Sequence, residues 1–221
     1  MSQTHSEENY LKAIWKLVEH SGENVSTNAI AASVNTKAAS VTDMLKKLAD
    51  KKLISYERYK GVTLTAKGKR VAVEVVRKHR LWEVFLVDQL KFKWDEVHDI
   101  AEQLEHIQSN ALTEKLDKFL GFPKVDPHGD PIPDKDGKIS SQHQVPLSQL
   151  ETGKKAIMTG VADHSALFLQ FLDKKEIKLG DAIELKEKTD YDHSMVILVN
   201  KKKSIQISNE VAKNILISGM K

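Results

Sequence analysis

The sequence predicts a mainly α-helical chain with small β parts, arranged in three segments. Apolar residues recur at helical spacing through about the first 120 positions. Two short alternating runs interrupt that pattern around residues 59–61, as in a β-hairpin. A proline- and glycine-rich stretch at 121–144, with four of the five prolines, separates the helices from a region of period-two alternation. The expected order is therefore a helical segment with a β-hairpin, a helical bundle and a small β-barrel.

The N-terminal segment has the pattern of a helix-turn-helix. A first amphipathic helix is expected at 7–20, and Ser26 can cap a short second helix over 27–35. A tight turn at 35–36 leads into a third helix at about 38–51. The hairpin follows directly, with Ile54 and Tyr56 on one strand and Val62 and Leu64 on the other. A helix-turn-helix followed by a hairpin is a winged helix.

Three further helices are expected before the proline-rich stretch. A long one begins at Thr65 or Ala66 and runs to about 90, and two shorter ones cover about 94–108 and 110–120. Their apolar residues suffice for a small bundle and could equally serve a dimer interface. Beyond the stretch, a short helix is expected at 165–173, and strands at 156–161, 182–185, 195–199 and 204–207.

Composition excludes several classes of protein. The 221 residues contain no cysteine, so a disulfide framework, a thiolate metal site and cysteine catalysis are excluded. No apolar run approaches the roughly 20 residues of a membrane span, and the polar N-terminus is no signal peptide. We therefore expect a cytoplasmic protein that does not bind membranes. Neither a HExxH zinc motif nor a P-loop, GxGxxG or GxSxG motif is present, so an enzyme has little support.

The basic charge of the first segment favours a nucleic-acid partner. Residues 36–70 carry ten Lys/Arg against three Asp/Glu, and such a surface can neutralise phosphates. The start of a recognition helix reaches base edges, whereas later lysines and the wing contact phosphates. The predicted DNA-binding residues are Lys37, Ala39, Ser40, Thr42, Asp43, Lys46, Lys47, Arg58 and Lys60. The alternative is a helical domain with a lysine-rich surface.

The acidic middle segment, residues 71–140, carries imidazoles and carboxylates at helical spacing. His79 and Glu83 are four residues apart on one expected helix. The next helix presents His98, Glu102, Glu105 and His106, mostly four apart, on one face. Nitrogen and oxygen ligands without sulfur suit Mn²⁺, Fe²⁺, Co²⁺, Ni²⁺ or Zn²⁺. The alternative is ordinary salt bridging between glutamate and histidine along a helix.

Taken together, these stretches resemble the diphtheria toxin repressor family of metal-dependent transcriptional regulators, including its manganese transport regulator branch. The resemblance covers nearly the whole chain and rests on EENYLKAIWKL, ASVTDMLKKLADKKLI, LTAKGKRVAVEVVRKHRLWEVFL, WDEVHDIAEQLEHIQS and HGDPIP. FLQFLDKKEIKLGDAIEL resembles the family's SH3-like module, which is related to ferrous transport accessory domains. The resemblance implies a winged helix at 1–70, a helical metal-binding and dimerisation domain at 71–123, a linker at 124–146 and an SH3-like domain at 147–221.

The resemblance also assigns metal ligands. Glu102, Glu105 and His106 match the primary site, with Asn9 as the ligand from the first helix, and His79, Glu83 and His98 match the ancillary site. His164 is a candidate additional ligand from the third module. Glu102 stands where iron-responsive members have cysteine, which favours manganese over softer ions. Lys12 stands where the manganese branch has a glutamate ligand; a protonated lysine cannot ligate, but its charge could partly replace a second ion.

The resulting hypothesis is a homodimeric, divalent-metal-activated repressor that binds a palindromic double-stranded DNA operator and controls metal uptake. Mn²⁺ is the expected cofactor, with Fe²⁺ next and Zn²⁺, Co²⁺ or Ni²⁺ able to bind in vitro. One alternative is a winged-helix regulator that does not need metal. Another is a metal-buffering protein whose basic face is incidental.

Overall fold

The computed structural model describes residues 3–21, 24–57, 61–140 and 143–219. Contacts within the chain define two compact units. The N-terminal unit comprises residues 1–82, 101–116 and 133–139, and the C-terminal unit comprises 83–100, 117–132 and 140–221. No helix in the described residues is long and apolar enough to cross a membrane.

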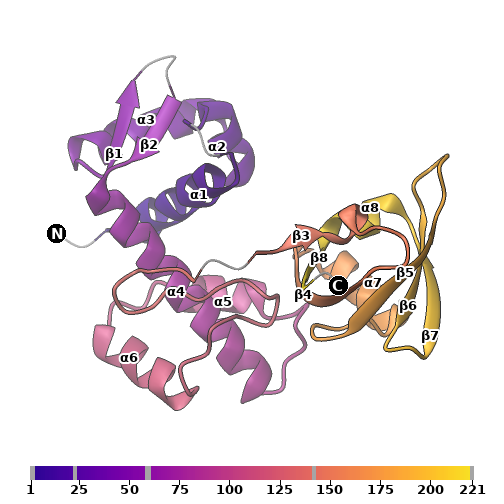
Figure 1. The fold of residues 1–221 in the computed structure, drawn as a ribbon. Coiled ribbons are helices and arrows are strands. Elements are labelled where there is room, and N and C mark those ends of the chain that lie inside the picture. Colours follow the sequence, from indigo (N-terminus) through magenta and orange to yellow (C-terminus); the bar gives the residue numbers. More distant parts are fainter. Residues whose placement is uncertain (1–2, 22–23, 58–60, 141–142, 220–221) are drawn as a thin grey trace. The chain divides into compact units, whose positions relative to one another are not determined.

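The N-terminal unit contains the predicted winged helix (Figure 1). Its helices are α1 (His5–Ser21), α2 (Thr27–Ser33) and α3 (Ala38–Asp50), followed by the antiparallel strands β1 (Ile54–Glu57) and β2 (Gly61–Leu64). The core that joins them is formed by fully buried Leu11, Ile14, Ile30, Leu45, Leu48 and Leu53. The predicted hairpin is confirmed, and in its register Ile54 lies opposite Leu64 and Tyr56 opposite Val62.

Local hydrogen bonds and one close backbone contact set the starts of two helices. The Ser26 hydroxyl accepts a hydrogen bond from the Ala29 backbone N–H at 3.1 Å, as expected of a helix N-cap. Thr65 likewise accepts from the Gly68 backbone N–H at 3.1 Å, at the start of α4 (Ala66–Asp88). A Cβ atom on Gly68 would lie 1.9 Å from the Leu53 carbonyl oxygen, so only glycine lets α4 start this close to the hairpin.

The helix expected at 94–108 is shorter in the structure. It is α5 (His98–Leu104), and α6 (Asn110–Phe119) follows it. In the C-terminal unit, the Trp94 indole N–H donates to Asp173, and the Gln170 amide donates to Asp95. Asp173 and Gln170 belong to α7 (Ala166–Lys175). These bonds hold residues 94–95 in a non-helical turn, which delays the start of α5.

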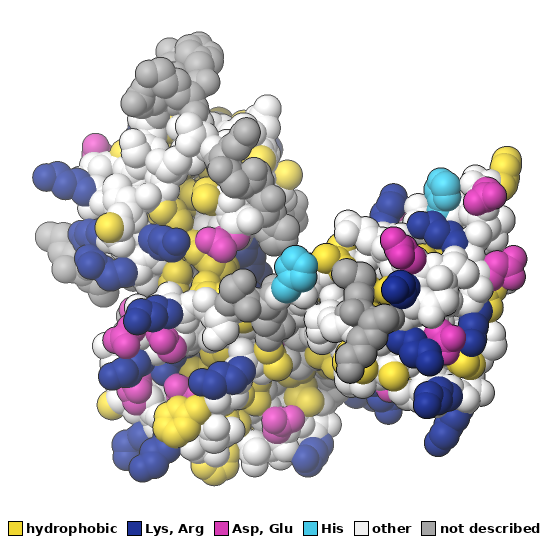
Figure 2. All heavy atoms as spheres, viewed as in Figure 1, with side chains coloured by type: hydrophobic (Ala, Val, Ile, Leu, Met, Phe, Trp, Pro, Cys, Tyr) yellow, Lys and Arg dark blue, Asp and Glu magenta, His cyan; other side chains and the backbone are white. Residues whose placement is uncertain are grey.

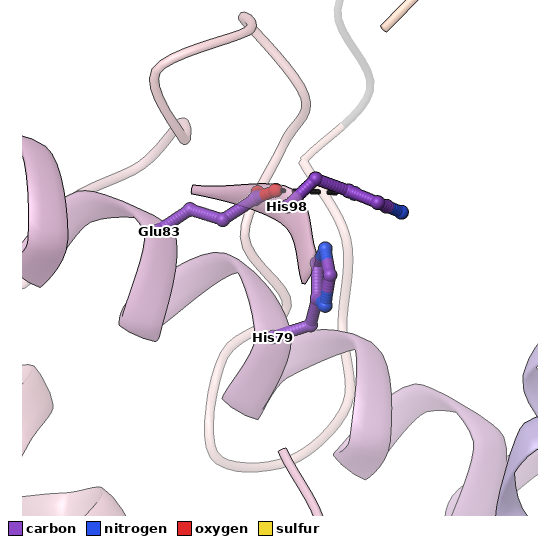
Figure 3. Close-up of side chains that lie close together, drawn as sticks. All are labelled: His79, Glu83 and His98. Carbon is purple, nitrogen blue, oxygen red and sulfur yellow. Dashed lines mark ion pairs between the residues drawn. The ribbon is translucent and has the colours of Figure 1, made fainter. Parts of the chain in front are cut away.

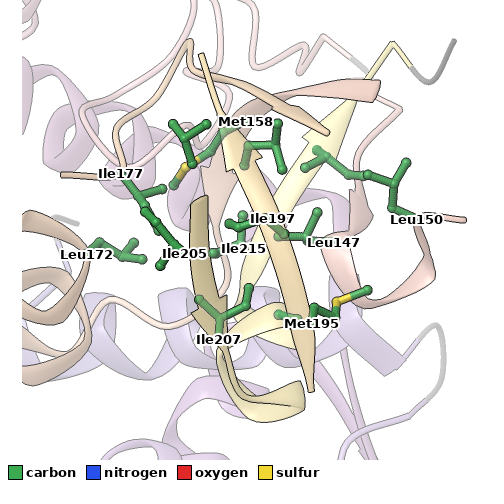
Figure 4. Close-up of a cluster of buried hydrophobic side chains, with 14 of the residues drawn as sticks. Leu147, Leu150, Met158, Leu172, Ile177, Met195, Ile197, Ile205, Ile207 and Ile215 are labelled. Carbon is green, nitrogen blue, oxygen red and sulfur yellow. The ribbon is translucent and has the colours of Figure 1, made fainter. Parts of the chain in front are cut away.

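The remainder of the C-terminal unit is a six-stranded antiparallel sheet in the order β3-β8-β4-β5-β6-β7. Its strands are β3 (Val145–Pro146), β4 (Lys155–Val161), β5 (Ala182–Lys188), β6 (Met195–Val199), β7 (Lys203–Ile207) and β8 (Ile215–Ser218). A 3₁₀ turn, η1 (Leu147–Gln149), and the helices α7 and α8 (Asn209–Asn214) complete it. Alternate residues of the strands, such as Met195 and Ile197, form a buried core with Leu147 and Leu172 (Figure 4). The sequence-based prediction contained neither β3, β8 nor α8.

Candidate functional site

A buried group of imidazoles and carboxylates lies within the C-terminal unit. Glu83 from α4, Asp126 and His128 each offer a ligand atom, and these atoms lie within 4.8 Å of one another. Glu83 Oε1 is 3.5 Å from His98 Nδ1, and Glu83 Oε2 is 3.7 Å from His128 Nδ1. These separations exceed hydrogen-bond length. Each separation taken alone is in the range expected of two atoms bound to one ion, since atoms bound about 2.1 Å from a metal lie roughly 3 to 4 Å apart. The two separations involve different oxygens of Glu83, and His98 is not part of the group of Glu83, Asp126 and His128.

The loop that carries Asp126 and His128 is tightly built. Asp126 Oδ1 accepts backbone N–H bonds from His128 at 2.8 Å and from Asp130 at 3.0 Å. Gly129 has φ +91°, and a Cβ there would lie 2.1 Å from the Thr159 carbonyl oxygen on β4. The His128 carbonyl in turn accepts from the Val161 N–H at 3.0 Å. The loop is thus held against β4 by a backbone hydrogen bond and by the close approach at Gly129.

The orientation of the His128 ring aims one nitrogen at Glu83. Its Nε2 lies 2.9 Å from the Trp94 carbonyl oxygen, so the Nε2–H donates there and Nδ1 faces the carboxylates. His128 Nδ1 is buried and has no hydrogen-bond partner among the described residues. Burial by itself would lower the pKa of His128, but the carboxylates of Glu83 and Asp126 outweigh it and raise that pKa to about 9. A metal that bound at this nitrogen would therefore have to displace a proton.

Two other predicted ligands lie beside this group. His79 is one turn before Glu83 on the continuous helix α4, and Figure 3 shows both side chains with His98 from α5. His164 stacks on His128 with ring centroids 4.8 Å apart, and its Nε2 lies 3.3 Å from the Val161 carbonyl oxygen. Metal binding by His79, Glu83, His98 and His164 stays a prediction.

A second set of predicted ligands lies within the N-terminal unit and has a different geometry. Lys12 Nζ donates to Glu105 Oε1 at 2.7 Å and to Glu102 Oε1 at 3.1 Å. The other oxygen of Glu105 lies 2.6 Å from His79 Nδ1. Burial would raise the pKa of Glu105, but the hydrogen bond from His79 and the charge of Lys12 hold it below its usual range. The carboxylates of this set are therefore already satisfied by cationic and N–H donors.

The contact from the first helix to His106 comes from a residue that the prediction did not include. Glu8 Oε2 lies 2.6 Å from His106 Nδ1, and Glu8 Oε1 accepts from the Gln108 amide at 2.6 Å. Asn9, the ligand that the resemblance assigns to this helix, is exposed. Metal binding by Asn9, Glu102, Glu105 and His106 stays a prediction.

The candidate nucleic-acid surface is the exposed face of α3. Lys37 precedes the helix as its N-cap residue, and Ala39, Ser40 and Asp43 are exposed. Thr42 is half-buried and donates to the Ala38 carbonyl. On the face drawn in Figure 2, basic side chains are mixed with acidic ones and form no single patch. Arg58 and Lys60 lie outside the described residues.

The lysines of α3 are partly neutralised within the unit. Lys47 and Lys51 contact the fully buried carboxylate of Glu7 at 3.0 and 2.8 Å, whereas Lys46 pairs with the exposed Asp43 at 3.4 Å. Burial would raise the pKa of Glu7, but the two lysines outweigh it and lower the pKa to about 2. Glu7 thus fixes the C-terminal end of α3 to α1, whereas the exposed Lys46 is paired with Asp43 instead.

The prediction missed Asp126, His128, Glu8 and the contacts of Lys12. The sequence DPHGD carries a signal for the first two, because two carboxylates and an imidazole fall within five residues around a glycine. Its position in a stretch rich in proline and glycine led to its assignment as linker. Glu8 and Lys12 lie one turn apart on an otherwise apolar helix face, which is a signal for a buried polar pair.

Comparisons with known proteins agree across the chain. Residues 3–62 match the family described as "Iron dependent repressor, N-terminal DNA binding domain". Residues 65–134 match "Iron dependent repressor, metal binding and dimerisation domain", and residues 145–219 match the FeoA domain. Among solved structures, a manganese-dependent transcriptional repressor in complex with manganese is 32% identical, with a TM-score of 0.88, over 96% of this chain and 99% of that chain.

Curated relatives include an HTH-type transcriptional regulator and an iron-dependent repressor. The HTH-type transcriptional regulator MntR of Oceanobacillus iheyensis is 32% identical over 123 residues, 56% of this chain and 82% of that protein. The iron-dependent repressor IdeR of Mycobacterium leprae is 34% identical over 126 residues, 57% of this chain and 54% of that protein. The match thus spans about half the length of the mycobacterial repressor.

The fold and the match over the whole of a solved repressor define the class as winged-helix, metal-dependent transcriptional regulators. The chain belongs to the diphtheria toxin repressor family, which includes the manganese transport regulators.

Proposed function

We propose that the chain is a divalent-metal-activated transcriptional repressor that binds an operator in double-stranded DNA as a homodimer and controls metal-ion uptake. The observation that carries the proposal is the buried group of Glu83, Asp126 and His128, whose ligand atoms lie within 4.8 Å of one another. The DNA-binding part of the proposal rests on the match of residues 3–62 to the family's DNA-binding domain.

The metal is proposed from the donor atoms. They are carboxylate oxygens and imidazole nitrogens, and the chain has no cysteine, which favours Mn²⁺ over softer ions and leaves Fe²⁺ as the next candidate. The solved relatives include a repressor described with bound manganese and ScaR described with bound Cd²⁺ and Zn²⁺. Zn²⁺, Co²⁺ and Ni²⁺ are accordingly expected to bind in vitro.

The proposed mechanism is thermodynamic linkage between metal and DNA. An ion at this site would neutralise the carboxylates and draw α4, α5 and the 126–128 loop into one fixed arrangement. If that arrangement binds DNA better, metal shifts the population toward it.

The homodimer is proposed from exposed apolar surface. Side chains such as Phe119 and Phe122, 64% and 56% exposed, provide surface that a second copy could bury. The protein is proposed to act in the cytoplasm as a regulator and not as an enzyme.

The proposal is tested by DNA binding at fixed salt, because phosphate contacts make affinity salt-dependent. Labelled fragments from upstream of the protein's own gene and of neighbouring transporter genes are titrated in chelator, in Mn²⁺ and in anaerobic Fe²⁺. We expect a specific shift that requires metal, at least about tenfold tighter than in chelator. The variant Lys46→Glu should weaken it about tenfold, whereas Lys154→Glu, an exposed lysine of the C-terminal unit, should not.

Two results would contradict this function. Equal specific binding in chelator would point to a winged-helix regulator that does not need metal. Tight metal binding with no sequence preference among DNA fragments would point to a metal-buffering protein.

A further inference from the structure

Lys12 is a buried lysine. It lies on α1 and is only 6% exposed, and lysines are almost never buried unless they are paired. Its ammonium group lies between two carboxylates, 2.7 Å from Glu105 and 3.1 Å from Glu102, both within the N-terminal unit. The Glu105 side chain is itself fully buried. The ammonium group is therefore the positive charge that compensates these carboxylates.

The geometry around Lys12 leaves these carboxylates closed to an ion. Both oxygens of Glu105 are engaged at direct hydrogen-bond length, one by Lys12 and the other by His79 at 2.6 Å. The imidazole of His106 is held by Glu8 at 2.6 Å. A metal needs ligand oxygens and nitrogens about 2.0–2.2 Å from a common centre, and that centre would fall next to the ammonium nitrogen. A protonated lysine has three N–H donors and no lone pair, so it cannot be a ligand.

The side chains around Glu83 are spaced differently from those around Lys12. There the carboxylate-to-imidazole separations are 3.5 and 3.7 Å, and the buried Nδ1 of His128 has no hydrogen-bond partner among the described residues. Around Lys12 the direct contacts of Glu102 and Glu105 are 2.6 to 3.1 Å long, and His106 Nε2 lies 3.7 Å from the Glu105 oxygen that Lys12 occupies. The carboxylates of Glu102 and Glu105 are thus in direct contact with the ammonium group of Lys12, whereas the Glu83 carboxylate is 3.5 and 3.7 Å from its two imidazoles.

The same contacts join α1 to the residues of α5 and its C-terminal end. Lys12 reaches Glu102 and Glu105, and one turn earlier Glu8 reaches His106 and Gln108. These bridges do not depend on a metal. Each bridge is a direct contact between side chains, so it joins α1 to α5 or to the residues that follow it without a bridging ion.

We infer that Lys12 is a built-in cation that takes the place of a metal ion between Glu102 and Glu105 and fixes α1 permanently. Regulation by metal then depends on the group of Glu83, His98, Asp126 and His128 alone. The regulatory meaning of this inference rests on the proposed function, but the lysine bridge itself does not.

The first test is the number of manganese ions bound per chain, measured by equilibrium dialysis with elemental analysis. The wild-type protein should bind one ion, Glu83→Gln none and Glu105→Gln one. Lys12→Glu replaces the ammonium group with a carboxylate and should bind two, whereas the control Lys154→Glu should bind one. A wild-type protein that binds two ions, with Glu105→Gln reduced to one, would overturn the inference, as would a folded Lys12→Glu that binds only one.

The second test needs no metal and applies even if Lys12→Glu does not fold. Backbone amide exchange in α1 is followed in chelator for the wild type and for the milder Lys12→Gln. We expect α1 to be protected in wild-type protein without metal, and exchange to accelerate about tenfold or more in Lys12→Gln. Protection of α1 that appears only on adding Mn²⁺ would overturn the inference. Failure of the proposed function is distinguishable, since it would remove the metal response of DNA binding and leave the α1 protection unchanged.

Discussion

Replacing His128 with glutamine is expected to lower the affinity for Mn²⁺ about a hundredfold or more and to remove metal-stimulated DNA binding. Loss of an outer-shell partner alone costs a metal site 10–100-fold, and His128 is proposed as a direct ligand. Its ring is held by the Trp94 carbonyl at Nε2, which leaves Nδ1 facing Glu83. A glutamine side chain keeps the polarity but provides no imidazole nitrogen at that position.

The measurement is a titration with Mn²⁺ followed by calorimetry and by thermal unfolding. Ligand at a hundred times its dissociation constant stabilises a folded protein by about 2.7 kcal/mol, so the wild type should show a clear rise in melting temperature. The His128→Gln protein should show almost none at the same concentration. The control is His143→Gln, an exposed histidine of the C-terminal unit, which should respond as the wild type does. Equal Mn²⁺ affinity in the His128→Gln and wild-type proteins would remove His128 from the site.

The affinity for Mn²⁺ is expected to rise steeply with pH, by about tenfold for each unit up to roughly pH 9. The carboxylates of Glu83 and Asp126 raise the pKa of His128 to about 9 in the metal-free protein. At pH 7 the imidazole is therefore protonated, and a metal must displace that proton. Above pH 9 the proton is already lost, and the dependence on this group should level off.

Proton release is measured directly by calorimetry at pH 7 in two buffers of different ionisation enthalpy. Close to one proton should be released for each Mn²⁺ bound at the Glu83 group. His128→Gln should abolish this release, and His143→Gln should leave it unchanged. Binding that releases no proton at pH 7 would show that His128 is not a ligand, or that its carboxylate neighbours do not hold a proton on it.

The elements of the N-terminal unit could be predicted from the sequence because local signals agree there. The Ser26 cap, the apolar spacing of α3 and the alternation on both sides of the wing all point to one fold. Elements set by distant contacts were harder to predict. Residues 94–95 leave the helical pattern because α7 binds them, and β3 is too short to show a period of two.

Some residues of the candidate site could likewise be predicted from local spacing, and others could not. Glu83 and His98 were predicted because helical spacing brings their side chains to defined faces. Asp126 and His128 lie on a loop whose path depends on Gly129 packing against β4, and no local period encodes that contact. The contact between Lys12 and Glu105 could not be predicted from the sequence either, because the two residues are 93 positions apart in the chain.

If metal controls DNA binding, the two ligands share one coupling free energy, and each must raise the affinity for the other by the same factor. The affinity for Mn²⁺ is measured with and without a saturating operator fragment, and the affinity for the operator with and without saturating Mn²⁺, at one pH and one salt concentration. Linkage requires the two ratios to be equal, and a coupling of about 1–3 kcal/mol would make each of them about 5- to 150-fold. If DNA leaves the affinity for Mn²⁺ unchanged, the metal does not control DNA binding and the account is wrong.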